Sequence, residues 1–500
     1  MGIRSAIAGK AAYFIARAVY RAQQQAVPLQ QRLFSELVRV GAGTKFGRQR
    51  GITARMRVAD FQKAVPVTDY EALTPYIQEI ADGRPDVLWW GLPLYFCKSS
   101  GTTSGTKYIP VSKEQLAAMI RAARDALMLY VAKTGRSRFF DRKMIFLQGS
   151  PALEKYGAIP AGRLSGIVYH HVPFYARANR MPSYQVNCIE DWEEKITAIA
   201  RETLPEPMSV ISGIPPWVVM YFEKLRELSG KKFIKDIFPH FELFVYGGVN
   251  YEPYRQKIEE LIGCNIPSVE TYPASEGFIA YQDSQQQEGL LLNVNGGLFF
   301  EFVEPHQLDN PHPERLTLQD IETGKNYAVI LTTNAGLWAY NLGDTVRFVS
   351  KNPYRLVVTG RVKHFISAFG EHVIAEEVEQ AMQYAIRQTG CTVVEFSVAP
   401  QVNPPAGTAP HHEWWVEFGR EPSDISRFSA LLDEYMQNRN PYYRDLRQGN
   451  ILQQARVISL PPGAFAAYMK SIGKLGGQNK VPRLKNDRSI AHTLEKMFIP

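Results

Sequence analysis

The sequence predicts an α/β fold (with α+β elements) made of a large N-terminal domain with a β-rich portion and a small, mobile α/β C-terminal domain. Strand-like runs alternate with helical patterns in the middle of the chain, which is typical of an α/β sheet. From Gly289 strand-like runs dominate, and near residue 365 a new β-α-β-like pattern begins. Because 500 residues exceed one ordinary domain, we expect a large domain over residues 1–365 and a small one over residues 366–500.

The composition excludes several classes of protein. The hydrophobic fraction of 45% and the charged fraction of 21% are typical of an ordinary soluble globular chain. The four cysteines lie far apart and form no C-x-x-C pair, so neither a disulfide framework nor a zinc site is indicated. This cysteine usage fits a reducing compartment, and we expect a cytoplasmic protein.

The N-terminal segment is basic, with almost no acidic residue before Asp60. Residues 7–19 are apolar but interrupted by Lys10 and Arg17, so this run is too short and too charged to span a bilayer. We expect a packed helix with a basic face; the alternative is a helix that makes weak contact with a membrane surface. No nucleic-acid motif accompanies the charge, so no nucleic-acid partner is expected.

Residues 98–110 combine glycines, hydroxyl side chains and a lysine between a strand-like run and an amphipathic helix, which Ser112 and Gln115 would cap. Backbone N–H groups, hydroxyl donors and a cation suit a polyphosphate. Lys107 comes two residues after Gly105 and precedes Tyr108, so this is not an ordinary P-loop. The alternative is a solvated loop. The candidate phosphate-binding residues are Ser99, Ser100, Thr102, Thr103, Gly105 and Lys107.

Other elements follow from periodicity and from glycine and proline. The adjacent histidines His170 and His171 are expected to have structural or hydrogen-bonding roles rather than to bind a metal together. Loops are expected over residues 41–51 and 157–166, a helical pattern broken at Pro66 and Pro75 over 60–80, strands over 143–147 and 208–212, and helices over 30–40, 190–201 and 216–228.

Two successive strands, residues 241–246 and 268–272, end in loops that contain glycine or hydroxyl residues. In open α/β sheets the ligand lies at the carboxyl ends of the strands, so both loops could reach one site. The backbone of Gly247, Gly248 and Val249 could meet an adenine edge, and Tyr272 could offer it a flat face. Glu276 could hold Mg²⁺, which prefers carboxylate and phosphate oxygens. The alternative for each loop is an ordinary turn.

The β-rich portion contains two further signals. Residues 289–294 and 298–303 flank Asn295-Gly296-Gly297, which predicts a hairpin. Asp344 follows a glycine turn and suits a diol such as ribose, although an ordinary hairpin is the alternative.

The C-terminal part predicts a helix over residues 376–389, strands over 391–399, 413–418 and 451–460, and a helix over 425–438. The basic segment 473–483 looks like a mobile loop. Domain rotation could deliver its Lys480 to a phosphate; the alternative is a flexible surface loop.

Taken together, the motifs resemble the auxin-responsive (Gretchen Hagen) acyl acid–amido synthetases, in their bacterial branch, within the adenylate-forming superfamily that includes acyl-CoA ligases and luciferase. Four motifs, which occur in the family's order, carry this resemblance over nearly the whole chain. Residues 99–107 are similar to S-S-G-T-(S/T)-x-G-x-K, 272–277 to Y-x-x-S-E-G (with Ser275 and Glu276), 340–344 to Y-x-x-G-D, and 478–483 to Q-x-K-x-P-R.

The resemblance implies ATP and Mg²⁺ as cofactors and a carboxylic acid and an amine, such as an amino acid, as substrates. It assigns Lys107 and its neighbours to the phosphates, Glu276 to Mg²⁺ and Asp344 to the ribose. Arg361 and Lys480 would supply positive charge once the small domain has rotated over the site. His372 stands where many relatives have lysine, so it receives no phosphate contact. Some plant members place a substrate-binding arginine in the helix that here holds Arg121 and Arg124, but neither can be aligned with it.

Two rival functions remain open from the sequence. An acyl-CoA ligase would form the same adenylate but consume coenzyme A. A nucleotide-binding peripheral protein would bind AMP without turnover.

Overall fold

The computed structural model describes residues 2–100, 106–248, 251–308, 310–361, 365–366, 373–402, 404, 410–448, 452–476, 479–485 and 487–499. The chain forms two compact units. Unit 1 comprises Met1–Ile214, Lys224–Gly248 and Ile266–Val357, and unit 2 comprises Pro215–Glu223, Val249–Asn265 and Val358–Pro500.

The main sheet of unit 1 has 11 strands in the order β12-β13-β14-β15-β11-β10-β9-β8-β7-β3-β6. The strands are β3 (Lys143–Phe146), β6 (Arg180–Met181), β7 (Met208–Ser212), β8 (Leu243–Gly247), β9 (Ser268–Ala274), β10 (Gly277–Tyr281), β11 (Leu290–Leu292), β12 (Leu298–Val303), β13 (Asn326–Thr333), β14 (Tyr340–Lys351) and β15 (Tyr354–Arg361).

The two halves of this sheet differ in strand direction. Neighbours among β6, β3, β7, β8 and β9 run parallel, whereas those among β9, β10 and β11 and among β12, β13 and β14 run antiparallel. The parallel half confirms the α/β prediction. It also places the carboxyl ends of β8 and β9 side by side, as expected for the two loops that follow them.

A second sheet of unit 1 has four strands in the order β2-β1-β5-β4. It contains β1 (Tyr95–Ser100), β2 (Thr106–Val111), β4 (Glu154–Tyr156) and β5 (Ile159–Gly162). The loop predicted over residues 98–110 is therefore wrong at both ends: β1 and β2 form an antiparallel hairpin in which Ser99 lies opposite Lys107. The consecutive buried residues Ile109, Pro110 and Val111 pack against the core and explain the second strand.

Helices cover this scaffold. Those of unit 1 include α1 (Ile3–Gln24), α2 (Ala26–Gly41), α3 (Lys45–Gln49), α4 (Val58–Ala64), α5 (Tyr70–Ala81), α6 (Lys113–Thr134), α7 (Leu164–His170), α8 (Phe174–Arg177), α9 (Tyr184–Asn187), α10 (Trp192–Thr203) and α12 (Ile234–Ile237); α11 (Pro215–Ser229) belongs in part to each unit.

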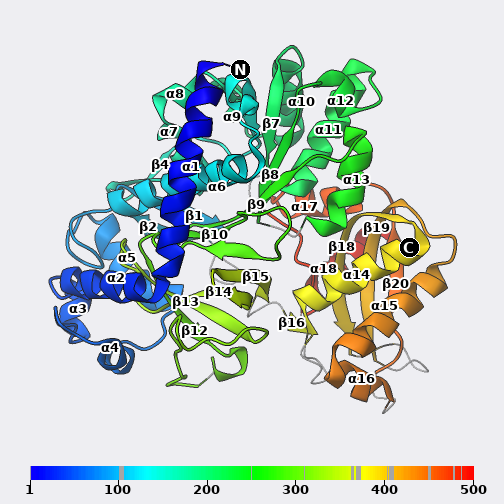
Figure 1. Ribbon diagram of the computed structural model, residues 1–500. Coiled ribbons are helices and arrows are strands. Elements are labelled where there is room, and N and C mark those ends of the chain that lie inside the picture. The colour runs from blue at the N-terminus through cyan, green and yellow to red at the C-terminus, as the bar shows by residue number, and fades with distance from the viewer. Residues whose placement is uncertain are drawn as a thin grey trace. The chain divides into compact units, whose positions relative to one another are not determined.

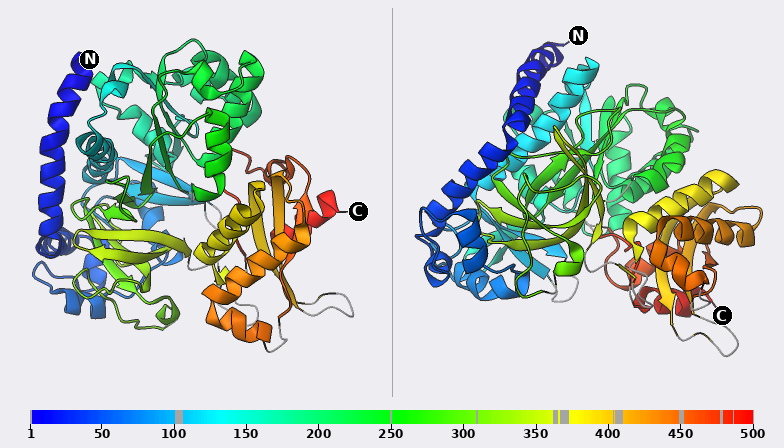
Figure 2. Two further views of the ribbon diagram at one scale, coloured as in Figure 1. Left: turned by 45° about the vertical axis from the view of Figure 1, so that its right-hand side comes forward. Right: turned by 60° about the horizontal axis from the view of Figure 1, so that its bottom comes forward.

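Helix α6 is the central helix of unit 1. As predicted, Ser112 caps it, since its hydroxyl accepts a hydrogen bond of 3.0 Å from the Gln115 backbone N–H. Met119 and Leu129 of α6 pack in one apolar cluster with Val210 and Val269 of the parallel strands, and Ala12 of α1 joins the same cluster. Helix α1 lies along the outside of unit 1 as one long rod (Figure 2).

Three predicted irregular segments are wrong. The loop expected over residues 41–51 contains α3, whose Thr44 side chain accepts a hydrogen bond from Gly47 N–H. Pro75 does not break its helix but lies inside α5, which buries Leu73 and Ile77 in the core. The loop expected over residues 157–166 contains β5, which pairs with β1, and the start of α7.

The predicted hairpin at Asn295-Gly296-Gly297 is also wrong. Strand β11 pairs with β10 and β15, and β12 pairs with β13, so the two runs that flank the glycines are not partners. Gln30 of α2 donates hydrogen bonds to the carbonyl oxygens of both Val294 and Leu298, and it holds the connection open between the two strands.

Unit 2 is built on a three-stranded sheet in the order β18-β19-β20, from β18 (Thr392–Gln401), β19 (His411–Arg420) and β20 (Arg456–Leu460). Its helices α14 (Ala375–Thr389) and α15 (Ile425–Arg439) share one core with Trp414, and α17 (Ala464–Ser471) and α18 (Ser489–Phe498) share another with Trp415. Figure 1 labels these helices and the three strands. Unit 2 also holds α13 (Glu252–Ile262), α16 (Pro441–Gln448), β16 (Phe365–Ile366) and β17 (Val373–Ile374).

Candidate active site

The β1–β2 hairpin presents a lysine that is not neutralised by any described carboxylate. The Lys107 ammonium lies 5.4 Å from the centre of the Tyr70 ring, and no ion pair to it occurs in the described part of the chain. Tyr70 also accepts a hydrogen bond of 2.9 Å from the Tyr108 backbone N–H, which fixes the ring beneath the strand. Lys98 on the opposite strand is, by contrast, paired with Glu154 at 2.7 Å. Lys107 is therefore the cation of this hairpin that is placed to receive an anion.

The turn between β9 and β10 is held against the hairpin and α6. Ser275 and Glu276 form this two-residue turn, since Ala274 lies opposite Gly277. The Cys97 thiol of β1 donates to the Ser275 hydroxyl at 3.2 Å, and the Gln115 amide of α6 donates to the Glu276 carbonyl oxygen. These two bonds bring three segments that are distant in sequence to one place.

Asp344 is tied to the same region through Tyr272. The Tyr272 hydroxyl donates a hydrogen bond of 2.7 Å to the Asp344 carboxylate, which joins β9 to β14. The predicted glycine turn before Asp344 is wrong, because both residues lie within β14, where Gly343 takes a φ of +84°. Only glycine adopts this value without strain, and the irregularity lets Asp344 leave the regular pleat.

The end of β8 is packed so closely on β9 that its last residue must be glycine. A Cβ at Gly247 would lie 2.3 Å from the Thr271 carbonyl oxygen. Gly248 follows, exposed and with a φ of +84°. At this end of β8 the two glycines therefore leave the backbone without side chains.

Burial shapes the electrostatics of the site. The Cys97 thiol is fully buried, which raises its pKa to about 12, and the nearby Glu276 carboxylate adds to this rise. The His171 ring nitrogen Nε2 shares a hydrogen bond of 2.9 Å with the Tyr95 hydroxyl. The Nε2 atom of its neighbour His170 lies 2.8 Å from the Pro151 carbonyl oxygen. These contacts confirm hydrogen-bonding roles for the two histidines. No cluster of potential metal ligands occurs among the described residues.

The predicted site residues fall into three groups. Unit 1 contains Ser99, Lys107, Gly248, Tyr272, Ser275, Glu276 and Asp344. Lys480 and Arg361 belong to unit 2. Thr102, Thr103, Gly105 and Val249 lie outside the described residues, as do the side chains of Ser100 and Arg361.

The sequence did not reveal the residues that support the site. Tyr70, Cys97 and Gln115 act through contacts between segments far apart in the chain, so no local pattern marks them. Gln115 had one signal, its place three residues after the Ser112 cap, but that signal indicated only the helix start.

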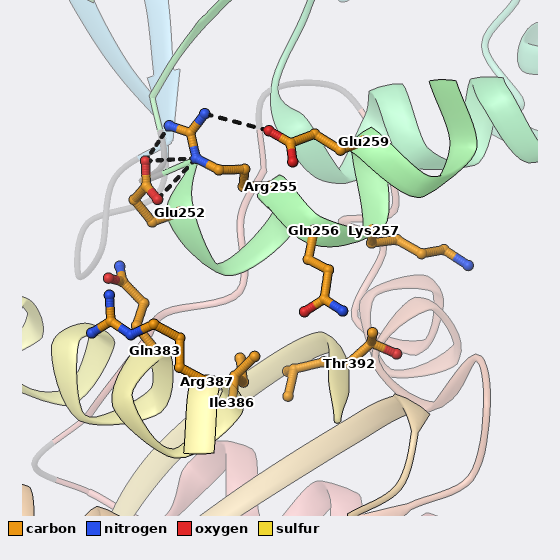
Figure 3. Close-up of a pocket in the computed structure, with 10 residues that line it drawn as sticks. Glu252, Arg255, Gln256, Lys257, Glu259, Gln383, Ile386, Arg387 and Thr392 are labelled. Carbon is orange, nitrogen blue, oxygen red and sulfur yellow. Dashed lines mark hydrogen bonds and ion pairs between the residues drawn. The ribbon is translucent and has the colours of Figure 1, made fainter. Parts of the chain in front are cut away.

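A pocket in unit 2 contains none of these residues. It has a volume of about 190 Å³ and lies between α13 and the segment formed by α14 and β18 (Figure 3). Arg255 at its rim points along α13 to Glu252 and Glu259, which neutralise it. Its other lining residues include Lys257, which pairs with Glu223 at 3.0 Å.

The fold as a whole is similar to the folds of two solved structures, an acyl acid amido synthetase and a CoA ligase. The solved structure of GH3.15 acyl acid amido synthetase is similar over 97% of this chain and 96% of its own, with a TM-score of 0.80 and 16% identity. A 2-hydroxyisobutyryl-CoA ligase in complex with 2-HIB-AMP is similar over 95% and 92%, with a TM-score of 0.64 and 13% identity.

The particular family follows from the sequence. The chain matches the GH3 family N-terminal domain over residues 16–187 and 161–266, the central domain over 291–361 and the C-terminal domain over 376–489. It belongs to the GH3 family, which confirms at the level of the family the resemblance drawn from the four motifs.

The relatives of this chain include plant amido synthetases. The chain is 23% identical to the jasmonoyl–L-amino acid synthetase JAR4 of Nicotiana attenuata, over 64% of this chain and 66% of JAR4, so it spans just under two thirds of that relative. It is 21% identical to the indole-3-acetic acid-amido synthetase GH3.3 of Arabidopsis thaliana, over 94% of this chain and 91% of GH3.3.

Proposed function

We propose that this chain is an ATP-dependent acyl acid–amido synthetase, a ligase that forms a carbon–nitrogen bond through an acyl-adenylate. The observation that carries the proposal is the convergence of Lys107, Glu276 and Asp344 in unit 1, where the bonds Cys97–Ser275 and Tyr272–Asp344 hold their segments together. Family membership and the overall fold support it.

The reaction has two half-reactions. A carboxylate oxygen of the acid bonds to the α-phosphorus of ATP, the bond from that phosphorus to the bridging oxygen breaks, and pyrophosphate leaves. The amine nitrogen of an amino acid then bonds to the acyl carbon, loses a proton, and expels AMP. Catalysis of this kind depends on positioning and on neutralising phosphate charge rather than on a protein nucleophile.

The residues of the site fit ATP and Mg²⁺. The hairpin residues Ser99, Ser100, Thr102, Thr103 and Gly105 would surround the phosphates, and Lys107 would neutralise one of them. Glu276 is a buried carboxylate at the turn, a donor that suits Mg²⁺, and the ion would neutralise phosphate charge there. Asp344 would accept hydrogen bonds from the ribose hydroxyls, and Gly248, Val249 and Tyr272 would frame the adenine.

The remaining charge would come from the C-terminal part of the chain. We propose that residues 1–365 form the large domain. Residues 366–500 form a small domain that rotates over the site and carries Lys480 toward it. Arg483, which lies in the same Q-x-K-x-P-R motif as Lys480, supports this role. It is buried, donates to the Tyr254 hydroxyl at 2.6 Å and pairs with Glu395 and Glu379 of unit 2. It thereby anchors the loop that presents Lys480 three residues earlier.

Pyrophosphate release tests the proposal. ATP·Mg²⁺ is offered with benzoate, phenylacetate, indole-3-acetate or hexanoate, with and without amino acids, and the products are identified by mass. We expect release that requires an acid and increases with an amine, together with an amide. Lys107→Ala and Asp344→Ala should lower the rate at least about 10-fold, because the first removes a cation from the phosphates and the second removes the acceptor of the ribose hydrogen bonds.

Matched variants separate these roles from general damage. Lys98→Ala removes a lysine of the same hairpin that is already paired with Glu154, and Asp320→Ala removes an exposed aspartate of the same unit; both should retain the rate. Binding of AMP without any pyrophosphate release would instead support a nucleotide-binding protein without turnover.

An acyl-CoA ligase is the second candidate, because a CoA ligase shares the fold. It would form the same adenylate and would then transfer the acyl group to coenzyme A. Thioester formation on addition of coenzyme A, with no amide from amino acids, would move the chain to this class.

We further propose that the N-terminal helix makes weak contact with an anionic membrane surface. Helix α1 contains four basic residues and no acidic residue. Its outer face exposes Ile3 (81%), Ile7 (62%) and Phe14 (68%). Apolar and basic side chains on one helix face suit a surface of anionic lipid. No described helix meets the length and hydropathy needed to cross a bilayer.

Vesicle sedimentation tests this contact. The chain should sediment with phosphatidylserine-containing vesicles at low salt and much less with pure phosphatidylcholine. Phe14→Glu should reduce sedimentation several-fold, whereas Leu92→Glu, an exposed apolar residue elsewhere in unit 1, should not. Equal sedimentation of all three proteins would contradict the proposal. A cytoplasmic location, which the four scattered cysteines favour, and a bacterial origin complete the proposal.

A further inference from the structure

Arg163 stands out in unit 1 as a half-buried guanidinium without a partner. The structure gives its side chain no hydrogen bond and no ion pair within the described residues, and burial lowers its pKa. A buried cation without a counter-ion is costly, so such a residue indicates a place for an anion. Arg180 of the same unit is, by contrast, occupied: it lies over the Tyr169 ring and donates to the Tyr169 carbonyl oxygen at 2.6 Å.

The backbone of Arg163 lies beside the candidate active site. It directly follows β5, whose last residue, Gly162, lies opposite Cys97 of β1 in the parallel pairing. Leu164, the next residue, directs its N–H to the Cys97 thiol, and that thiol also contacts Ser275 of the β9–β10 turn. The Arg163 charge lowers the pKa of the Cys97 thiol and the Glu276 carboxylate raises it, so both charges lie near this thiol.

The side chain of Arg163 reaches the end of β3. A Cβ built on Gly149 would lie 2.8 Å from the Arg163 Cδ and 3.6 Å from its Nε, so the arginine stem packs on this glycine. Gly149 follows β3, which runs parallel to β7 in the main sheet. The guanidinium thus lies at the carboxyl edge of the parallel strands, where ligands bind in open α/β sheets.

A second cation and an unsatisfied amide accompany it. Lys195 is buried and donates to the Asn187 carbonyl oxygen at 2.5 Å, and burial, with a smaller contribution from the Arg163 charge, lowers the Lys195 pKa to about 8. Neither amide atom of the Asn187 side chain, which is fully buried, has a hydrogen-bond partner in the described structure. Two neighbouring cations without a described carboxylate favour an anionic ligand.

The arginines of helix α6 are unsuited to this task. Arg124 pairs with Asp125 at 2.6 Å, and Arg121 is exposed and donates to the Asn295 carbonyl oxygen at 3.0 Å. Arg163 is also poorly placed to bind the phosphates of ATP, which Lys107 is proposed to contact. Lys107 lies on the β2 side of β1, whereas Arg163 follows β5 on its opposite side.

We propose that Arg163 binds the carboxylate of the acyl acid and holds it for attack on ATP. A guanidinium accepts a carboxylate through two parallel N–H···O bonds, which fixes the orientation of the attacking oxygen as well as its position. The inference rests on the proposed function, since it names the residue that recognises the acid in that reaction.

The test compares the free acid with its adenylate. With the panel acid that gives the fastest pyrophosphate release, Arg163→Gln should raise the KM for the acid about 10- to 100-fold, the loss expected for one charge-assisted bidentate contact, and leave the KM for ATP within about 2-fold. Arg163→Lys should fall between, because it keeps the charge but not the fork. Arg201→Gln, which removes an exposed arginine of the same unit, should match the wild type.

The second half-reaction provides the independent readout. Supplied with the prepared acyl-adenylate and an amino acid, Arg163→Gln should form amide at close to the wild-type rate, because the adenylate no longer carries a free carboxylate. An unchanged KM for the acid, an equal rise in the KM for ATP, or an equal loss in both half-reactions would overturn the assignment. If the wild-type chain released no pyrophosphate with any acid, the proposed function would fail, and this inference with it.

Discussion

At the scale of single residues, Cys97 shows how a reactive group can serve the site without reacting. Its thiol donates to Ser275, and burial raises its pKa to about 12. At pH 8 only about one such thiol in 10⁴ would be ionised, so it is a poor nucleophile. Its task is to join β1 to the β9–β10 turn. Arg163 is the contrasting residue: it is charged, half-buried and without a described partner, and so it is placed to receive a ligand.

Alkylation tests the role of Cys97. With iodoacetamide at pH 8, the exposed Cys264 should be modified first, and the buried Cys97 and Cys391 should stay unmodified for much longer, because few of their thiols ionise. Peptide mass mapping follows each site, and unfolding in urea should make all four cysteines reactive. Modification of Cys97 as fast as Cys264 in the folded protein would contradict its buried, protonated state.

At the scale of elements, the site depends on the start of α6. The Ser112 hydroxyl accepts a hydrogen bond from the Gln115 backbone N–H and donates one of 2.8 Å to the Asn334 carbonyl oxygen. The Gln115 side-chain amide donates in turn to the Glu276 carbonyl oxygen. The first turn of one helix thus fixes the turn that carries the proposed Mg²⁺ ligand. This arrangement makes the helix cap important for the site as well as for stability.

Removing the cap should therefore be costly. Ser112→Ala should lower the free energy of unfolding by about 1–2 kcal/mol, measured by urea denaturation, since it leaves the Gln115 N–H without its acceptor. Ser35→Ala on the exposed face of α2 is the control and should change stability by less than about 0.5 kcal/mol. A Ser112→Ala protein as stable as the control would show that the cap contributes little.

Much of the element structure could be predicted, because it is local. The periodicity of residues 113–134 and the apolar runs at 143–146, 208–212 and 243–247 each mark one element. Pairing could not be predicted in the same way. The partners of β11 are β10 and β15 rather than β12, which follows it in the sequence. Strand β2 lies within residues 98–110, whose glycines and hydroxyl side chains indicate a loop.

The candidate site shows the same division. Motifs that lie within a few residues, such as Ser275-Glu276 or Gly343-Asp344, could be found in the sequence. Cys97, Tyr70 and Arg163 could not, since their importance arises from neighbours that the fold supplies from distant segments.

At the scale of the whole molecule, the proposed reaction draws on both units. Unit 1 contains Lys107, Glu276 and Asp344, whereas Arg361 and Lys480 belong to unit 2. Arg483 fixes the Lys480 loop within unit 2 through Tyr254 and Glu395, and the bridge between Val398 and Leu484 extends that anchor. Rotation of the small domain, as proposed, would then move Lys480 as part of a rigid body rather than as a free loop.

The fate of the carboxylate oxygens tests the central claim most directly. The acid is labelled with ¹⁸O in its carboxylate and incubated with ATP·Mg²⁺ and an amino acid. In the proposed reaction the oxygen that attacks the α-phosphorus stays with AMP when the amine breaks the acyl–oxygen bond. We predict one ¹⁸O in AMP, one in the amide and none in pyrophosphate. Label in inorganic phosphate with ADP as the other product, or AMP without label, would contradict the acyl-adenylate account.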